Sequence, residues 1–129
     1  MKNILFLLGM TAILLFATCK DLKNEFPTCT ITAPAKDAEF NLDDEINVVV
    51  TANDDNGVIA QVQLYIDNEG YGSITNFPYN FTIPAETLKA GAHIIKAVAI
   101  SNSGNKGEDV VSITVKNTFT ECANFETFN

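Results

Sequence analysis

The 129-residue sequence contains no arginine and no tryptophan, and it has few basic residues for its acidic ones. All eight basic residues are lysines, and with sixteen acidic residues they give a formal charge of -8. A chain of this charge is repelled by nucleic acid and by anionic lipid surfaces. The sequence therefore predicts no nucleic-acid partner, and any attachment to a membrane must come from something other than charge.

The chain also has little that could perform catalysis. Its single histidine, His93, follows Gly91 by two residues, where the pattern favours a packing role at the start of a strand. No Ser-His-Asp or Cys-His grouping can be built around one histidine whose surroundings are core positions. Two cysteines and one distant histidine lack zinc-site spacing. We therefore expect no catalytic residue, no metal and no cofactor, and we keep an enzyme only as a remote alternative.

No apolar run reaches the roughly 20 residues that span a bilayer comfortably. The longest, Ile4 to Phe16, follows Met1-Lys2-Asn3 and has the length of a signal-peptide core. It ends in Leu15-Phe16-Ala17-Thr18-Cys19, which resembles the lipobox of bacterial lipoproteins, although Phe16 and Thr18 depart from its strictest form. We expect a helical signal peptide over 1–18, a lipid on Cys19 and a polar tether over 19–27. The alternative is a signal anchor that is never cut.

Lipidation has a direct consequence for location, because two or three acyl chains hold a protein firmly in a membrane where one would not. Cleavage before Cys19 would leave seven lysines against sixteen acidic residues. Asp21 and Glu25 then follow the lipidated cysteine. Acidic residues at this place resemble the surface-export signal of some Gram-negative lipoproteins, although here they are few. We expect an exported protein anchored in the bacterial outer membrane, facing either the periplasm or the cell surface.

Three cysteines leave one thiol unpaired in an oxidising compartment. Lipidation of Cys19 removes this oddity and leaves Cys29 and Cys122 as a candidate disulfide pair. If the first and last strands run parallel, the two cysteines lie near opposite ends unless the tail folds back. Residues 117–121 can span about 17 Å, so the bridge is feasible without being required. Both alternatives stay open.

From Thr28 onward, apolar residues alternate with a period of two, and polar turns separate the runs. The clearest run is Ile59–Asp67, where Gln61, Gln63 and Tyr65 are expected outward and Ala60, Val62, Leu64 and Ile66 inward. Phe40 is expected in a loop that plugs one end of the core, and residues 85–89 as one helical turn. The pattern predicts an all-β sandwich of about seven strands over 28–117, followed by a tail over 118–129. Further strands are expected at 29–32, 45–52, 73–75, 79–83, 92–100 and around 111–115.

Several segments resemble the bacterial Ig-like domains of exported and cell-surface proteins, namely Ile31-Thr32-Ala33-Pro34, Gly57 to Asp67, Pro78-Tyr79-Asn80-Phe81 and Gly91 to Ala99. The resemblance implies an immunoglobulin-like β-sandwich from about Thr28 to Lys116. It also implies a role as a spacer, an adhesive module or a companion of carbohydrate-active enzymes. Ser101 stands where an aspartate often closes the strand, which removes a potential cation ligand. The tryptophan and paired core cysteines of antibody domains are absent, so immune recognition is not implied.

Two groups of residues are candidates for binding. Tyr65, Tyr71, Asn76 and Tyr79 would form an aromatic platform for a sugar, whereas the alternative places Tyr79 in the core and the others over an edge. Asn53 to Asn56 would offer oxygens to calcium, but the run lacks EF-hand spacing and is typical of a solvated turn. We therefore expect a non-catalytic envelope lipoprotein whose domain binds, spaces or adheres to a protein or glycan. The alternative is a glycan-binding accessory protein of a polysaccharide-uptake system.

Overall fold

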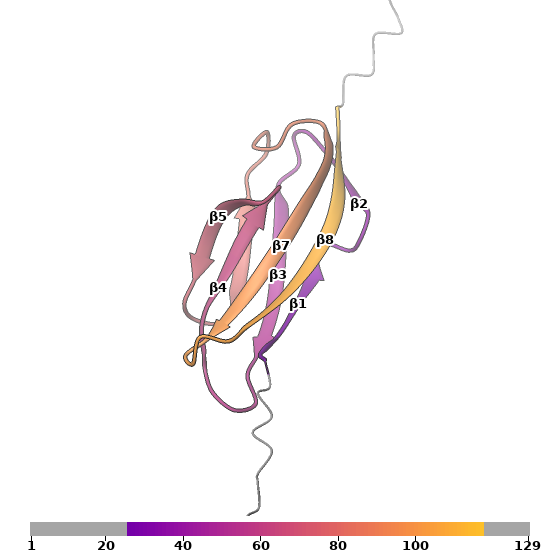
Figure 1. Ribbon diagram of the computed structural model, residues 1–129. Helices are drawn as coiled ribbons and strands as arrows, with labels where there is room; N and C mark the ends of the chain where they lie inside the picture. The colour runs from indigo at the N-terminus through magenta and orange to yellow at the C-terminus, as the bar shows by residue number, and fades with distance from the viewer. Residues whose placement is uncertain (1–25, 118–129) are drawn as a thin grey trace, which may run out of the picture.

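The computed structural model describes residues 26–117, in which eight strands form two sheets packed face to face (Figure 1). One sheet has the order β1-β3-β6 and the other β2-β8-β7-β4-β5. Within these residues no helix is long and apolar enough to cross a membrane. The strands are β1 Thr28–Ala33, β2 Ala38–Asn41, β3 Ile46–Asn53, β4 Ile59–Ile66, β5 Glu69–Ile74, β6 Tyr79–Ile83, β7 Gly91–Ser101 and β8 Lys106–Lys116.

The core lies between the two sheets, where every second side chain of the long strands is buried. In β7, Ile95, Ala97 and Ala99 are fully buried, and they face rows from β3 and β6 across the interior. Burial of a large aliphatic side chain contributes about 1.5–3 kcal/mol, so these rows hold the sheets together. The all-β sandwich expected from the period of two is confirmed. The other inward rows include Ile46, Val48, Val50, Val62, Leu64, Val111, Ile113 and Val115.

The inward row of β4 differs from the prediction at its first position. Ala60 is exposed, and Ile59 packs against the core instead. The pairing with β7 gives the reason: Ile59 pairs with Ser101, whereas Gln61 pairs with the adjacent Ile100. One extra residue of β4 therefore forms a β-bulge, which exchanges the inward and outward directions on its two sides. The prediction for Ala60 was wrong because a bulge depends on the partner strand.

Two segments also differ from the sequence-based expectation. Phe40 lies in the short strand β2, parallel to β8, and packs against the core from there rather than from a loop. Residues 85–88 form a turn with Glu86 at φ 63°, not a helical turn. The β4–β5 turn is centred on Asp67 and Asn68, both at positive φ, as a two-residue hairpin of the right twist requires.

Strand β1 belongs to the smaller sheet, yet its first residues contact β8 of the larger one. The Ile31 amide donates a hydrogen bond to Asp109 Oδ2 at 2.8 Å, and the Pro27 carbonyl oxygen lies directly against Gly107. These contacts show that β1 and β8 begin at the same end of the sandwich and run in the same direction. The start of β1 and the end of β8 therefore lie at opposite ends of the long axis (Figure 1).

The contact at Gly107 generates a stability prediction. A Cβ at this position would overlap the Pro27 carbonyl oxygen, a backbone atom that cannot rotate away. We expect Gly107→Ala to lower the free energy of unfolding by about 2 kcal/mol or more, measured by urea denaturation. Gly72→Ala is the matched control, because its Cβ would meet the Phe81 ring at an ordinary 3.9 Å. Equal stability of the two variants would contradict the close approach.

Candidate functional site

The outer face of β4 and β5 carries an open groove of about 310 Å³. Gln63 and Tyr65 project from β4 on this face, opposite Ser73 and Gly70 of the edge strand β5. Gly70 adds no side chain beside Tyr65, so this part of the groove stays open to a ligand. The lining residues are Gln63, Leu64, Tyr65, Gly70, Tyr71, Gly72 and Ser73.

Tyr65 is held in one orientation by its neighbours on three strands. Its hydroxyl donates a hydrogen bond to Gln63 Oε1 at 2.8 Å, and Lys96 Nζ lies 5.3 Å from the centre of its ring. On the other side, the ring reaches over Gly70, where a Cβ would lie 3.9 Å from Cε1. A side chain fixed before binding loses little entropy when a ligand stacks on it. Tyr65 is therefore the part of the groove best prepared to contact a flat, apolar ligand surface.

Tyr71 forms the wall of the groove at the open edge of the sandwich. In the β4–β5 pairing, Leu64 faces Gly72 and Tyr65 faces Gly70, so Tyr71 is the unpaired residue of a bulge. Its hydroxyl donates a hydrogen bond to the Thr82 carbonyl oxygen of β6 at 2.6 Å. Tyr71 thereby links the edge strands of the two sheets while more than a third of its side chain stays exposed.

The structure brings together only part of the predicted aromatic platform. Tyr79 is 6% exposed and fills the core beside Phe81, and Asn76 lies in the loop after β5, outside the groove. Phe77 meets Tyr79 edge to face, with ring centroids 6.0 Å apart, and is itself 78% exposed. Gln63 and Ser73 line the groove although the sequence analysis did not single them out. The alternation of β4 predicts that Gln63 faces outward, so this residue could have been found from the sequence. Only the pairing of β4 with β5 places Ser73 beside it.

His93 joins the β4–β5 turn to the segment before β7. Its Nδ1 lies 2.6 Å from Asp67 Oδ2, and its Nε2 lies 2.7 Å from the Lys89 carbonyl oxygen. Asp67 Oδ1 also accepts the Ile94 amide at 2.9 Å. Both ring nitrogens thus face acceptors, and only the protonated imidazolium can donate to both. The contact with Lys89 leaves Nε2 without a free position, so this Asp-His pair is not arranged as a general base.

The hydrogen bonds of this pair shift the pKa values of both residues. Burial lowers the pKa of His93, but the hydrogen bonds to Asp67 and Lys89 outweigh it and raise the pKa above its usual value. Burial likewise raises the pKa of Asp67, and the hydrogen bonds from His93 and the Ile94 amide bring it below its usual value. The pair is therefore an ion pair over a range of mildly acidic pH.

The remaining sequence candidates have local structural roles where the structure describes them. Cys29 is half-buried with its Sγ 3.5 Å from the Ala97 carbonyl oxygen, and burial raises the pKa of its thiol to about 11. Cys122 and Cys19 lie outside the described residues, so the disulfide and the lipid site stay predictions. Asp54 and Asp55 accept hydrogen bonds within their own turn, and residues 26–117 contain no cluster of three metal-binding side chains.

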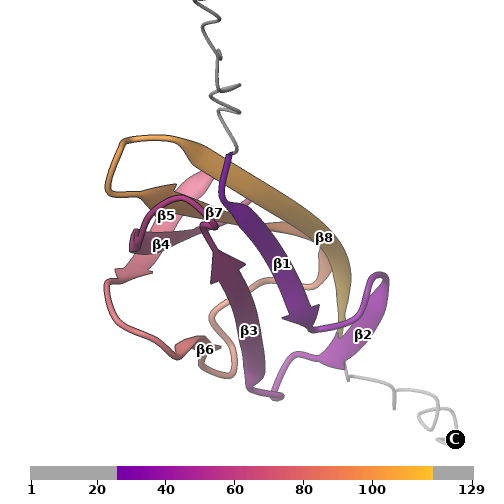
Figure 2. The same cartoon turned by 90° about the horizontal axis from the view of Figure 1, so that it is seen from below.

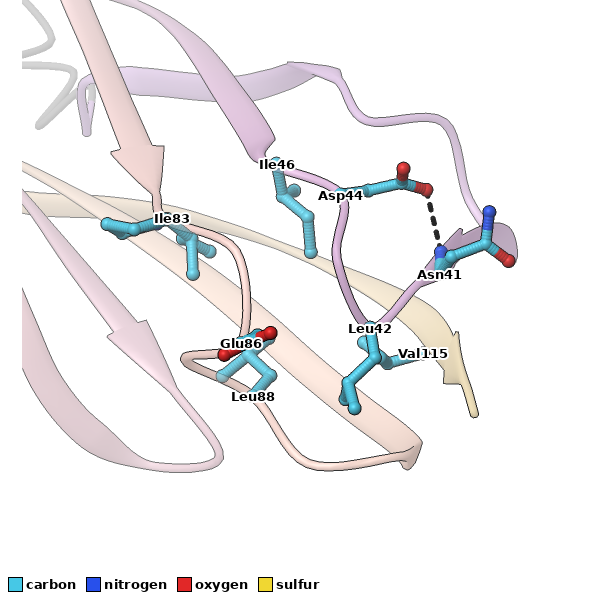
Figure 3. A pocket seen from close by; sticks show the side chains of 9 residues that line it. Asn41, Leu42, Asp44, Ile46, Ile83, Glu86, Leu88 and Val115 are labelled. Atoms are coloured by element: carbon cyan, nitrogen blue, oxygen red, sulfur yellow. Dashed lines mark hydrogen bonds between the residues drawn. The ribbon is translucent and has the colours of Figure 1, made fainter. Parts of the chain in front are cut away.

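A second depression lies at the end of the sandwich, beside the turn after β6 (Figure 3). Leu42, Ile83 and Leu88 point into it, and at its rim the Asn41 amide donates to Asp44 Oδ2 at 2.7 Å. Its volume of about 10 Å³ has room for about one water molecule. This crevice is too small to receive a ligand, so the groove on β4 and β5 is the better candidate site.

Two facing sheets in this strand order define a β-sandwich of the immunoglobulin and fibronectin type. A family model described as bacterial Ig domain matches residues 27–97, more than half of the sequence, and the chain therefore belongs to the bacterial Ig domain family. Domains of this family are typically extracellular or on the cell surface, and they are typically non-catalytic. The resemblance stated from the sequence is thus confirmed.

Solved structures agree with this assignment. The fibronectin(III)-like modules of Clostridium thermocellum CbhA match at 29% identity and a TM-score of 0.67, over 74% of this chain and 50% of that one. A Thermotoga petrophila endo-β-1,4-mannanase matches at 15% identity and a TM-score of 0.61, over 76% of this chain and 21% of that one. The chain thus spans half the length of the first structure and about a fifth of the second. No curated protein gave a significant match.

A third similar structure is SGBP-B of the Bacteroides ovatus mixed-linkage glucan utilization locus, solved in complex with a mixed-linkage heptasaccharide. It matches at 20% identity and a TM-score of 0.50, over 69% of this chain and 24% of that one. At this identity the likeness shows a shared fold.

The His93 contacts predict a dependence of stability on pH. Because the folded-state pKa of His93 is raised, its contribution is complete below the unfolded value of about 6.5 and is lost as pH rises through the folded value. Between pH 5.5 and 8.5 we expect the free energy of unfolding to fall by about 1 kcal/mol from this contact. His93→Gln keeps a polar side chain without the titration, so urea denaturation should show a smaller loss. An identical pH dependence in both proteins would refute the ion pair.

Proposed function

We propose that this protein is a non-catalytic lipoprotein of the bacterial envelope, anchored by acyl chains on Cys19, whose Ig-like domain serves as a binding or spacer module. The observation that carries the proposal is the position of the two chain ends of the domain. The segment from the anchor joins β1 at one end of the sandwich, and β8 finishes at the other (Figure 1). The eleven residues of β8 extend about 36 Å at about 3.3 Å per residue.

This geometry suits a spacer, because whatever follows β8 is carried a full domain length from the point of attachment. The sandwich also supplies a rigid support, since its core rows are buried from β3 to β8. The lipobox-like sequence before Cys19 and the usual extracellular location of the family both support export. Attachment to the outer membrane, facing the periplasm or the cell surface, is part of the same proposal.

Metabolic labelling with a fatty acid tests the anchor. We expect the full chain to take up the label and Cys19→Ala to lose it, because acylation needs the thiol of this residue. Cys29→Ala is the matched control and should label as the wild type does, since Cys29 lies inside the folded domain. Equal labelling of the wild type and Cys19→Ala would remove the lipoprotein proposal.

A second candidate function is a glycan-binding accessory protein of a polysaccharide-uptake system. The groove on β4 and β5 favours it, because an oriented tyrosine beside amide and hydroxyl groups suits the apolar face and the hydroxyls of a sugar. SGBP-B, solved with a mixed-linkage heptasaccharide, shows that this fold occurs in a glycan-binding protein. The support is therefore the chemistry of the groove together with a shared architecture.

Affinity electrophoresis in gels that contain mixed-linkage β-glucan tests this function. We expect the wild type to be retarded and Tyr65→Ala to lose affinity by about tenfold, about 1.4 kcal/mol, as for a central aromatic contact. Ile94→Ala removes an exposed side chain of the neighbouring strand outside the groove and should migrate as the wild type does. If no glycan in a panel retards the wild type, the glycan-binding function is excluded and the spacer role remains.

A further inference from the structure

Three of the six exposed large hydrophobic side chains of residues 26–117 lie at one end of the sandwich, and the other three, Tyr71, Ile94 and Val110, lie within strands. Among residues 26–117, the three most exposed large hydrophobic side chains are Phe77, Val58 and Phe26, at 78%, 64% and 63%. They lie before β1, before β4 and before β6, at the end where β1 begins (Figures 1 and 2). The connections at the opposite end, 42–45 and 84–90, carry no exposed large hydrophobic side chain. The two ends of the domain thus differ in polarity.

Backbone contacts hold the two segments that carry Phe26 and Val58 against the start of β8 and the β7–β8 turn. Pro27, next to Phe26, lies against Gly107 at the start of β8. Val58 is tied to the β7–β8 turn, because the Asn102 amide donates to the Val58 carbonyl oxygen at 2.8 Å.

Phe77 is held by its edge-to-face contact with Tyr79, which is buried in the core. The ordered domain therefore presents all three apolar side chains outward at the same end, where an apolar partner can reach them.

The chain itself indicates what covers this end. Cys19 precedes Phe26 by seven residues, which reach at most about 23 Å when fully extended. If Cys19 carries acyl chains, the bilayer that holds them lies within about this distance of Phe26, at the end of the sandwich that also carries Val58 and Phe77. The apolar end of the sandwich is then the end nearest to the lipid, and the polar end is the most distant.

We propose that this end of the domain rests on the lipid surface, with Phe26, Val58 and Phe77 inserted into the interfacial layer. The inference rests on the proposed lipid anchor at Cys19. Apolar and aromatic side chains are favoured in the interfacial layer, where the hydrocarbon begins. A tether alone would leave the domain free to reorient. This contact instead directs the long axis of the sandwich away from the membrane, so that the end of β8 lies far from the lipid.

Charge defines the kind of lipid surface. Asp54 and Asp55 lie at the same end, with Lys106 as a cation of β8, so the surface is not basic. Contact with an anionic headgroup layer is therefore not favoured, and the occupant is a zwitterionic surface. Because the contact is apolar, salt does not weaken it.

Single-tryptophan fluorescence tests the orientation, since the sequence contains no tryptophan of its own. The acylated full chain is reconstituted in phosphatidylcholine–phosphatidylethanolamine vesicles whose acyl chains carry bromine, which quenches nearby indole. We expect Phe77→Trp to lose at least half of its emission and to shift to the blue, at low and high salt alike. Thr87→Trp, an exposed position at the opposite end, is the matched control and should keep its emission.

Val58→Trp is a second probe at the apolar end, so the test does not depend on one variant that fails to fold. Unquenched emission from both Phe77→Trp and Val58→Trp, in protein that carries the fatty acid and sediments with the vesicles, would overturn the inference and leave the anchor intact. Equal quenching at Phe77 and Thr87 would overturn it as well, because the domain would then lie flat. Protein without fatty acid would overturn the proposed function and, with it, this inference.

Discussion

The alternation of buried and exposed residues along paired strands is the constraint on which the rest of this structure depends. A fully buried row such as Ile95, Ala97 and Ala99 fixes which side of β7 faces the opposite sheet. The other parity is then outward, and Lys96 must lie beside Tyr65 on the adjacent strand. The groove on β4 and β5 is a by-product of this packing, since its side chains are those that the core leaves outside.

The same constraint explains why the sequence alone predicted much of the fold. The period of two is visible in β3, β7 and β8, where hydrophobic rows are long and uninterrupted. Strand β2 was missed because four residues are too few for a period, and its pairing with β8 is what makes it a strand. The inward position of Ile59 was missed for a related reason, because a bulge is a property of two strands together.

The candidate site was less predictable, since it depends on contacts between segments that are distant in the sequence. Tyr65 and Tyr79 are the same residue type in similar patterns, yet one lies in the groove and the other in the core. Parity alone assigned Tyr65 correctly to the outer face, while the place of Ser73 follows from the position of the hairpin turn at Asp67 and Asn68. His93 contacts the backbone carbonyl oxygen of Lys89, and a contact with a backbone atom cannot be predicted from the pattern of residue types.

The edge of the larger sheet has a further consequence for how copies of this domain meet one another. An unprotected edge strand offers a row of free amide and carbonyl groups to the same strand of a neighbouring molecule. In β5 the bulge at Tyr71 interrupts that row, and the hydroxyl of Tyr71 occupies a carbonyl oxygen on the adjacent edge, β6. Neighbouring copies of the domain thus meet an irregular, partly occupied border, which discourages their polymerisation into a continuous sheet.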